Sequence, residues 1–136
     1  SNGTPLTGSF TPSATAGTTI LPTQGTGTYN KSGGVVTWTL TASITSLSGA
    51  SGNIIITGLP ISNMTAGTYG VIVDQFIGIT TYATFVLTSQ GLVGYKDNIG
   101  NVVTDGTQLT PLTYDDLQPP SIISLSGRYI VNNGTT

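Results

Sequence analysis

The sequence predicts an all-β protein, an antiparallel β-sandwich of jelly-roll type, and three observations lead to this class. Almost every apolar stretch is short, rich in β-branched residues and bounded by Gly, Asn, Asp or Pro, as in chains of many short strands. No window combines a 3.6-residue apolar period with helix caps, so we expect very little helix. The 136 residues are 37% hydrophobic with a net charge of -2, which favours one folded domain over a disordered chain.

The clearest strand is expected at residues 34–45, where one face is apolar and the other is lined by Thr and Ser. The apolar positions are Val36, Trp38, Leu40, Ala42 and Ile44. This alternation predicts an antiparallel strand with one face in the core and the other in solvent. Residues 53–58 are apolar on both faces and end at Gly58-Leu59-Pro60, because proline cannot donate to a strand ladder.

The remaining strands follow from shorter patterns of the same kind. Ala83, Phe85 and Leu87 share one face of a strand, and Asp97-Asn98-Ile99-Gly100 predicts a hairpin turn. The further strands are expected at residues 69–74, 76–79, 82–89, 91–97, 101–104 and 121–131. In the last of them, Ile123, Leu125, Tyr129 and Val131 share a face. Residues 1–24 are Thr, Gly, Pro and Ala with few apolar side chains, so we expect an extended arm or linker there and the folded domain at 25–136.

The scarcity of charge excludes most chemistry. Only eight side chains are charged, and the chain lacks histidine, cysteine and glutamate, so no Ser-His-Asp or Cys-His triad and no usual zinc site can form. Three cations are too few to neutralise a run of phosphates, and no apolar run approaches the roughly 20 residues of a membrane helix. We therefore expect no metal, no cofactor, no nucleic acid and no membrane insertion.

Asp115-Asp116 is the one pair of adjacent acids, and it raises the question of catalysis. A glycosidase holds two carboxylates about 5 to 9.5 Å apart across the scissile bond. Neighbouring residues of a strand point to opposite faces, and Asp commonly accepts local backbone N–H bonds in turns. The turn interpretation is favoured, and a polysaccharide depolymerase that uses Asp carboxylates remains the alternative.

Two clusters combine an aromatic ring with hydrogen-bonding neighbours near predicted loops. A sugar is bound by the face of such a ring together with carboxylate or amide groups that hold its hydroxyls. The expected ligand-binding residues are Tyr95, Asp97 and Asn98 in the first cluster and Tyr114, Asp115 and Asp116 in the second.

Three short motifs carry a family resemblance over residues 25–131. They are Gly27-x-Tyr29-x-Lys31-x-Gly33, Gly58-Leu59-Pro60 and Ser126-Gly127-Arg128-Tyr129. Together they resemble C-terminal domains of bacteriophage tail fibres and tailspikes. Each motif also has a purely structural interpretation, such as a glycine turn at Gly33 or a strand end at Pro60.

The resemblance implies a β-sandwich tip domain that forms a homotrimer and attaches a virion to a cell-surface glycan or another surface receptor. A tip of the same kind on a bacterial extracellular fibre is the alternative owner. We expect binding and assembly without catalysis. The faces that carry Ile54, Ile55 and Ile56, or Val71 and Val73, are the expected candidates for the threefold axis.

Overall fold

The computed structural model describes residues 6–96 and 110–131, and this part of the chain is almost entirely antiparallel β-structure, as the sequence predicts. Its one helical turn is the 3-10 helix η2 (Tyr114–Asp116). The strands are β1 (Leu6–Phe10), β2 (Ser13–Ala16), β3 (Thr19–Leu21), β4 (Thr23–Ser32), β5 (Val35–Ile44), β6 (Ile54–Thr57), β7 (Tyr69–Ile79), β8 (Ala83–Thr88), β9 (Gly91–Lys96), β10 (Thr110–Pro111) and β11 (Leu117–Ile130). The expected strand at 101–104 lies outside the described residues.

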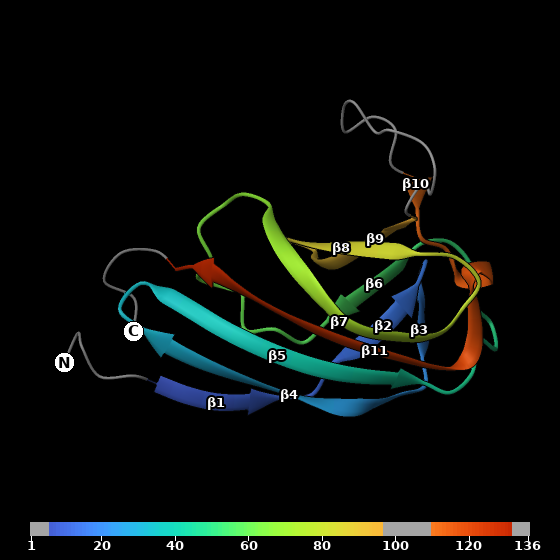
Figure 1. Ribbon diagram of the computed structural model, residues 1–136, viewed down its shortest axis with the longest axis horizontal. Helices are drawn as coiled ribbons and strands as arrows, with labels where there is room; N and C mark the ends of the chain where they lie inside the picture. The colour runs from blue at the N-terminus through green and yellow to red at the C-terminus, as the bar shows by residue number, and fades with distance from the viewer. Residues whose placement is uncertain (1–5, 97–109, 132–136) are drawn as a thin grey trace.

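The strands form one continuous sheet that folds over into two layers (Figure 1). The strand order is β1-β4-β5-β11-β7-β8-β9-β6-β2-β3, and β10 pairs with β9. Strands β1, β4, β5, β11 and β7 form the front layer, and β8, β9, β6, β2 and β3 form the back layer. The two layers meet at β7, which pairs with β11 along its length but with β8 through only two residue pairs.

The expected arm at residues 1–24 is wrong for the part of it that the structure describes. Strands β1, β2 and β3 are members of the sheet, and β2 lies between β3 and β6. Ala14 and Ala16 of β2 are fully buried and Leu21 of β3 is nearly so. Because the inward positions of β2 are alanines, the strand packs closely in the back layer while its sequence shows little hydrophobic contrast.

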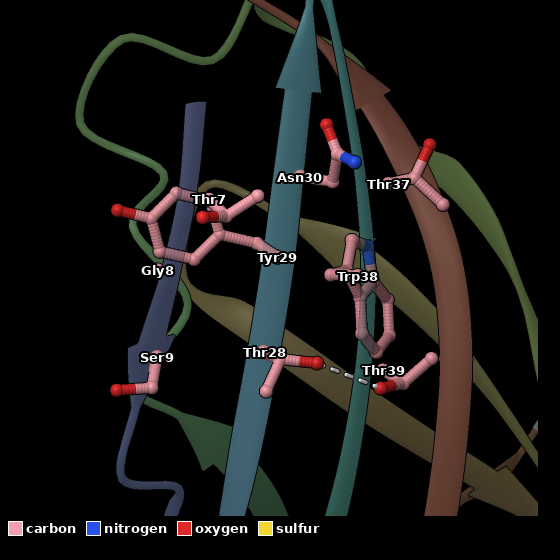
Figure 2. Close-up of a pocket in the computed structure, with 9 residues that line it drawn as sticks. All are labelled: Thr7, Gly8, Ser9, Thr28, Tyr29, Asn30, Thr37, Trp38 and Thr39. Atoms are coloured by element: carbon pink, nitrogen blue, oxygen red, sulfur yellow. Dashed lines mark hydrogen bonds between the residues drawn. The ribbon is translucent and has the colours of Figure 1, made fainter. Parts of the chain in front are cut away.

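Strand β1 is held against β4 by two reciprocal pairs of glycine and aromatic residues. Gly8 lies opposite Tyr29, and Phe10 lies opposite Gly27. Figure 2 shows the Tyr29 side chain reaching from β4 across to Gly8 on β1. A methyl group on Gly8 would overlap the Tyr29 ring, and one on Gly27 would overlap the Phe10 ring. Each aromatic ring therefore fills the space that the opposite glycine leaves, a device that compensates for glycine in strands.

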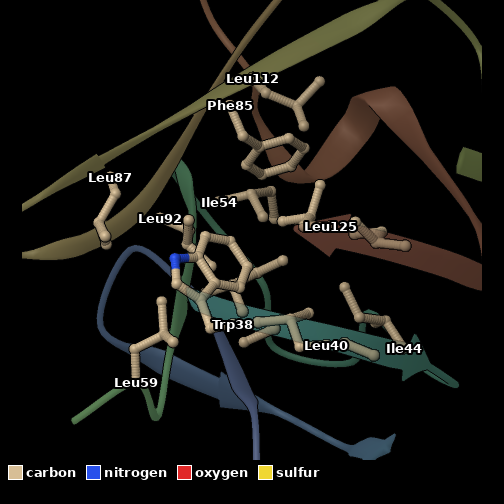
Figure 3. Close-up of a cluster of buried hydrophobic side chains, with 14 of the residues drawn as sticks. Trp38, Leu40, Ile44, Ile54, Leu59, Phe85, Leu87, Leu92, Leu112 and Leu125 are labelled. Atoms are coloured by element: carbon tan, nitrogen blue, oxygen red, sulfur yellow. The ribbon is translucent and has the colours of Figure 1, made fainter. Parts of the chain in front are cut away.

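The core lies between the two layers, and the long alternating strands supply most of it. All five predicted apolar positions of β5 are buried, as are Ile123, Leu125 and Tyr129 of β11, so both alternation patterns are confirmed. Figure 3 shows Trp38 and Leu40 from the front layer facing Leu92 and Ile54 from the back layer. The exposed fraction of Trp38 is 1%, although it is the largest side chain in the protein.

The structure also shows why two strand boundaries differ from the prediction. Residues 69–74 and 76–79 form one strand, β7, and its register against β11 shifts so that Asp74 is the extra residue of a β-bulge. Strand β11 starts at Leu117 rather than at Ser121. Its pairing with β7 is irregular between Leu117 and Ile122, so the prolines at 119 and 120 are accommodated where no regular ladder is formed.

Most of the side chains expected at a threefold axis are turned inward; the exception is Ile55, which is half-buried on the other face of β6. Ile54 and Ile56 have no exposed surface in this chain, and Val71 and Val73 pack against its own core. The isoleucines that point outward on β7 are Ile72 and Ile77, which are 64% and 48% exposed. On β7 the exposed apolar side chains are therefore on the opposite face from Val71 and Val73, because successive residues of a strand point to opposite faces.

We predict that Gly27→Ala destabilises the fold by about 1–3 kcal/mol, because the added methyl group displaces the Phe10 ring from β4. Gly70→Ala is the matched control, since no atom lies within 4 Å of the added carbon and Gly70 is also in a strand. We expect the control to change the free energy of unfolding by less than about 0.5 kcal/mol. Denaturant unfolding measures the free energy of unfolding of both variants. Equal losses of stability would contradict the close packing of Phe10 on Gly27.

A second prediction concerns Tyr129, whose hydroxyl donates to the carbonyl oxygen of Pro60 at 2.7 Å. Burial, with a smaller contribution from the nearby Tyr29, raises the pKa of Tyr129 from 10.0 to about 12. Between about pH 10 and pH 12 the unfolded chain loses this proton while the folded chain keeps it. Stability should therefore fall with rising pH across this window, by roughly 2–3 kcal/mol in total.

Tyr129→Phe should lose about 1 kcal/mol at neutral pH through the missing hydrogen bond, and its alkaline decline should be shallower. Unfolding curves recorded from pH 7 to pH 12 test this. Parallel declines in the two proteins would mean that another group controls alkaline stability.

Candidate functional site

Four of the six residues predicted to bind a ligand lie in the described part of the chain. Tyr95 is half-buried on β9, opposite Thr84 of β8 and Pro111 of β10. Tyr114, Asp115 and Asp116 make up η2. Asp97 and Asn98 lie outside the described residues.

Asp116 is a structural residue. Its Oδ1 lies 3.1 Å from Nζ of Lys96, and its Oδ2 accepts a hydrogen bond of 2.9 Å from the backbone N–H of Thr113. The residue is 8% exposed, so both carboxylate oxygens are used inside the fold. This arrangement caps η2 and supports the turn interpretation of the acidic pair.

Asp115 is exposed, and its carboxylate is directed at Thr113, as that of Asp116 is. The Thr113 hydroxyl is within hydrogen-bonding reach of Oδ1 of Asp115 and, at 3.1 Å, of Oδ2 of Asp116. Two carboxylates directed at one threonine do not stand on opposite sides of a substrate bond, which is the geometry that glycoside hydrolysis requires. This arrangement favours a structural role for the two aspartates in the turn at η2.

The fold brings Tyr95, the described member of the first cluster, close to the second cluster at one end of the back layer. Strand β10 places Thr110 beside Lys96 and Pro111 beside Tyr95, and the Lys96–Asp116 ion pair then joins β9 to η2. Sequence reasoning missed Lys96 because its partner is 20 positions away. Tyr114 keeps about a third of its surface exposed and is the ring of these clusters that is most open to solvent.

The outer face of the front layer forms a second candidate surface, which we call the hydroxyl face. Neutral polar side chains form most of its rows across the strands. A hydrogen bond joins Thr28 to Thr39 at 3.3 Å (Figure 2), and another joins Thr41 to Ser124 at 3.0 Å. The rows, read from the strand registers, are Ser9–Thr28–Thr39–Ser126–Ile72, Thr7–Asn30–Thr37–Arg128 and Thr26–Thr41–Ser124–Gln75. An open groove of about 600 Å³ lies on this face over β1, β4 and β5.

Residues 6–96 and 110–131 offer neither a metal-binding cluster nor a membrane-spanning helix. No group of three or more acidic side chains there could hold a metal ion. The same residues contain no helix with the length and apolar character needed to cross a membrane.

Comparison with solved structures finds a similar fold within a tailspike protein. The structure is similar to part of the crystal structure of the Dettilon tailspike protein (gp208), with a TM-score of 0.77 and 24% sequence identity. The alignment covers 94% of this chain and 24% of the tailspike chain, so this chain spans about a quarter of the tailspike's length. No protein-family model and no curated protein sequence matches the chain. At this identity the similarity establishes the fold.

We predict that Asp116→Ala destabilises the protein by about 1–3 kcal/mol, because it removes the cap of η2 and leaves Lys96 without its partner. Asp115→Ala is the control at the neighbouring exposed position, and we expect it to cost less than about 0.5 kcal/mol. Thermal unfolding of the two variants measures the difference. A larger loss in Asp115→Ala would reverse the assignment of the capping residue.

Proposed function

We propose that this chain is a non-enzymatic attachment domain of a trimeric phage tail fibre or spike, carried on the virion and directed at the host cell surface. The observation that carries the proposal is the agreement of nearly the whole chain with a segment of a tailspike chain. The chemistry of the residues supports it, since histidine, cysteine and glutamate are absent and Asp116 is committed to Lys96 and Thr113.

Two observations support the trimer. One is the resemblance to tail-fibre and tailspike domains, and the other is a surface that exposes apolar side chains to water. The hydroxyl face is mostly neutral, with Arg128 in one of its rows and Asp74 on β7, and Ile72 and Ile77 stand exposed along β7 at its margin. An exposed apolar margin beside a flat β-sheet favours association, and closed symmetry buries such surface without leaving a free edge. We assign the threefold contact to this margin in place of the inward faces of β6 and β7.

Light scattering after size exclusion tests the trimer. The chain of 13.9 kDa should elute with about three times its own mass. Ile72→Asp should shift the protein to the monomer, because it replaces an apolar side chain at the contact with a second carboxylate near Asp74. Ile20→Asp is the control, since Ile20 is 73% exposed on β3 of the other layer and should leave the trimer intact. A wild-type monomer at micromolar concentration would overturn the assignment.

A further inference from the structure

The front and back layers separate beside β7, and this separation opens a groove that none of the predicted clusters includes. Strands β7 and β8 pair only at Tyr69–Leu87 and Gly70–Val86. Beyond Gly70, β7 continues beside β11 in the front layer, while β8 pairs with β9 in the back layer (Figure 1). A groove of about 430 Å³ lies along this part of β7 and the start of β8, lined by Val73, Phe76 and Ile79, by Thr80, Thr81 and Tyr82 of the connection, and by Ala83.

The floor of the groove is apolar and rests on the core. The Phe76 ring lies 5.9 Å from the Phe85 ring, and Phe85 is almost completely buried. Val73, Ile79 and Ala83 are half-buried and also pack against the core. The floor is therefore held in place by the packing of the whole domain, so a ligand would find the site already formed.

The rim is polar and is fixed at one side. The backbone N–H and the hydroxyl of Thr80 both bond to the carbonyl oxygen of Asp116, at 2.9 Å and 3.2 Å. Tyr82, two residues further on, is 63% exposed, which is unusual for an aromatic side chain in a protein with so few of them. The connection thus presents one open ring and threonine hydroxyls above an apolar floor.

The charge of the groove defines the class of its ligand. No carboxylate and no cation is among the residues that line it. The nearest described cation along the sheet is Lys96, opposite Ala83, and its ammonium group is paired with Asp116 at 3.1 Å. An anionic ligand would lose water here without gaining a free partner, so an uncharged ligand is favoured.

We propose that this groove binds an uncharged hexopyranose unit of a surface glycan, with the Tyr82 ring stacked on the apolar face of the sugar and the threonine hydroxyls bonded to its rim. The proposal rests on the proposed attachment function and adds to it a site and a preference for neutral sugars. A single shallow site of this kind binds weakly, in about the millimolar to micromolar range, and three copies on one trimer raise the effective affinity.

The test is an NMR titration of the full chain with methyl glucoside, methyl galactoside and methyl mannoside, and with methyl glucuronide as the anionic contrast. We expect at least one neutral sugar to shift the amide signals of residues 80–83 and of Phe76, and the glucuronide to bind at least about tenfold more weakly than that sugar. Tyr82→Ala should weaken binding at least about tenfold, while Tyr82→Phe, which keeps the ring, should stay within about threefold of wild type.

Ile20→Ala is the control, because it removes an exposed large side chain from β3, outside the groove, and should leave sugar binding unchanged. Unfolding curves and light scattering verify that each variant is folded and has the mass of the wild type. Shifts that map to Tyr95 and Tyr114, unchanged affinity in Tyr82→Ala, tighter binding of the glucuronide, or no response to any neutral sugar would each overturn the groove assignment.

Loss of the trimer in Tyr82→Ala would also overturn it, because the ring would then belong to a contact between protomers. These outcomes are separate from a failure of the attachment function. That function is contradicted when the wild-type chain is monomeric by light scattering, whichever residues respond to sugar.

Discussion

The burial of Trp38 is the constraint around which the two layers are built. Its indole ring fills the space between them, and its strand neighbours in register are Tyr29 on β4 and Gly127 on β11. An added carbon at Gly127 would lie 3.0 Å from Cζ2 of Trp38, so only glycine leaves the ring room at that position without rearrangement. Truncation of a buried tryptophan typically costs about 3–5 kcal/mol.

The indole N–H of Trp38 is unfavourably placed, and its cost can be compared with the gain from burying the ring. Trp38 Nε1 is buried and has no hydrogen-bond partner in the described part of the protein. A buried donor without a partner costs about 1–3 kcal/mol, which is less than the typical value of burying the ring. The packing of the ring therefore outweighs the loss of its hydrogen bond, and the core keeps a tryptophan at a position that offers its N–H nothing.

The three motifs of the family resemblance meet at this core, which explains why they report the fold. Tyr29 of the first motif and Gly127 of the third lie on either side of Trp38. Tyr129 of the third motif bonds to Pro60 of the second, and Gly58 takes a φ of 119°, a conformation that suits glycine. The motifs are points where chain segments must approach closely, so they are interpreted better as packing requirements than as ligand contacts.

The sequence was sufficient where a single strand carries its own pattern and insufficient where a contact depends on register. The alternation of β5 and β11 needed no partner to be recognised. The burial of Ala14 and Ala16 was hidden because alanine contributes little hydrophobic contrast, and the outward position of Ile77 depended on a bulge at Asp74 that no local signal indicates. The turn role of Asp115-Asp116 followed from local chemistry, whereas the Lys96 partner of Asp116 required the pairing of β10 with β9. The groove at Tyr82 could not be predicted from the sequence, because it exists only where β7 and β8 separate.

The small number of charges has a physical consequence for how such a domain can bind. Lys96 and Asp116 neutralise each other, and the hydroxyl face and the Tyr82 groove are lined mostly by neutral side chains. Long-range steering and salt-sensitive ion pairs therefore have little part in recognition by these surfaces. In the binding that we propose, affinity would come from ring stacking, hydroxyl hydrogen bonds and the repetition of weak sites, all of which change little with ionic strength. A surface of this kind would distinguish ligands by shape and by the placement of hydroxyl groups, which is the information that neutral sugars carry.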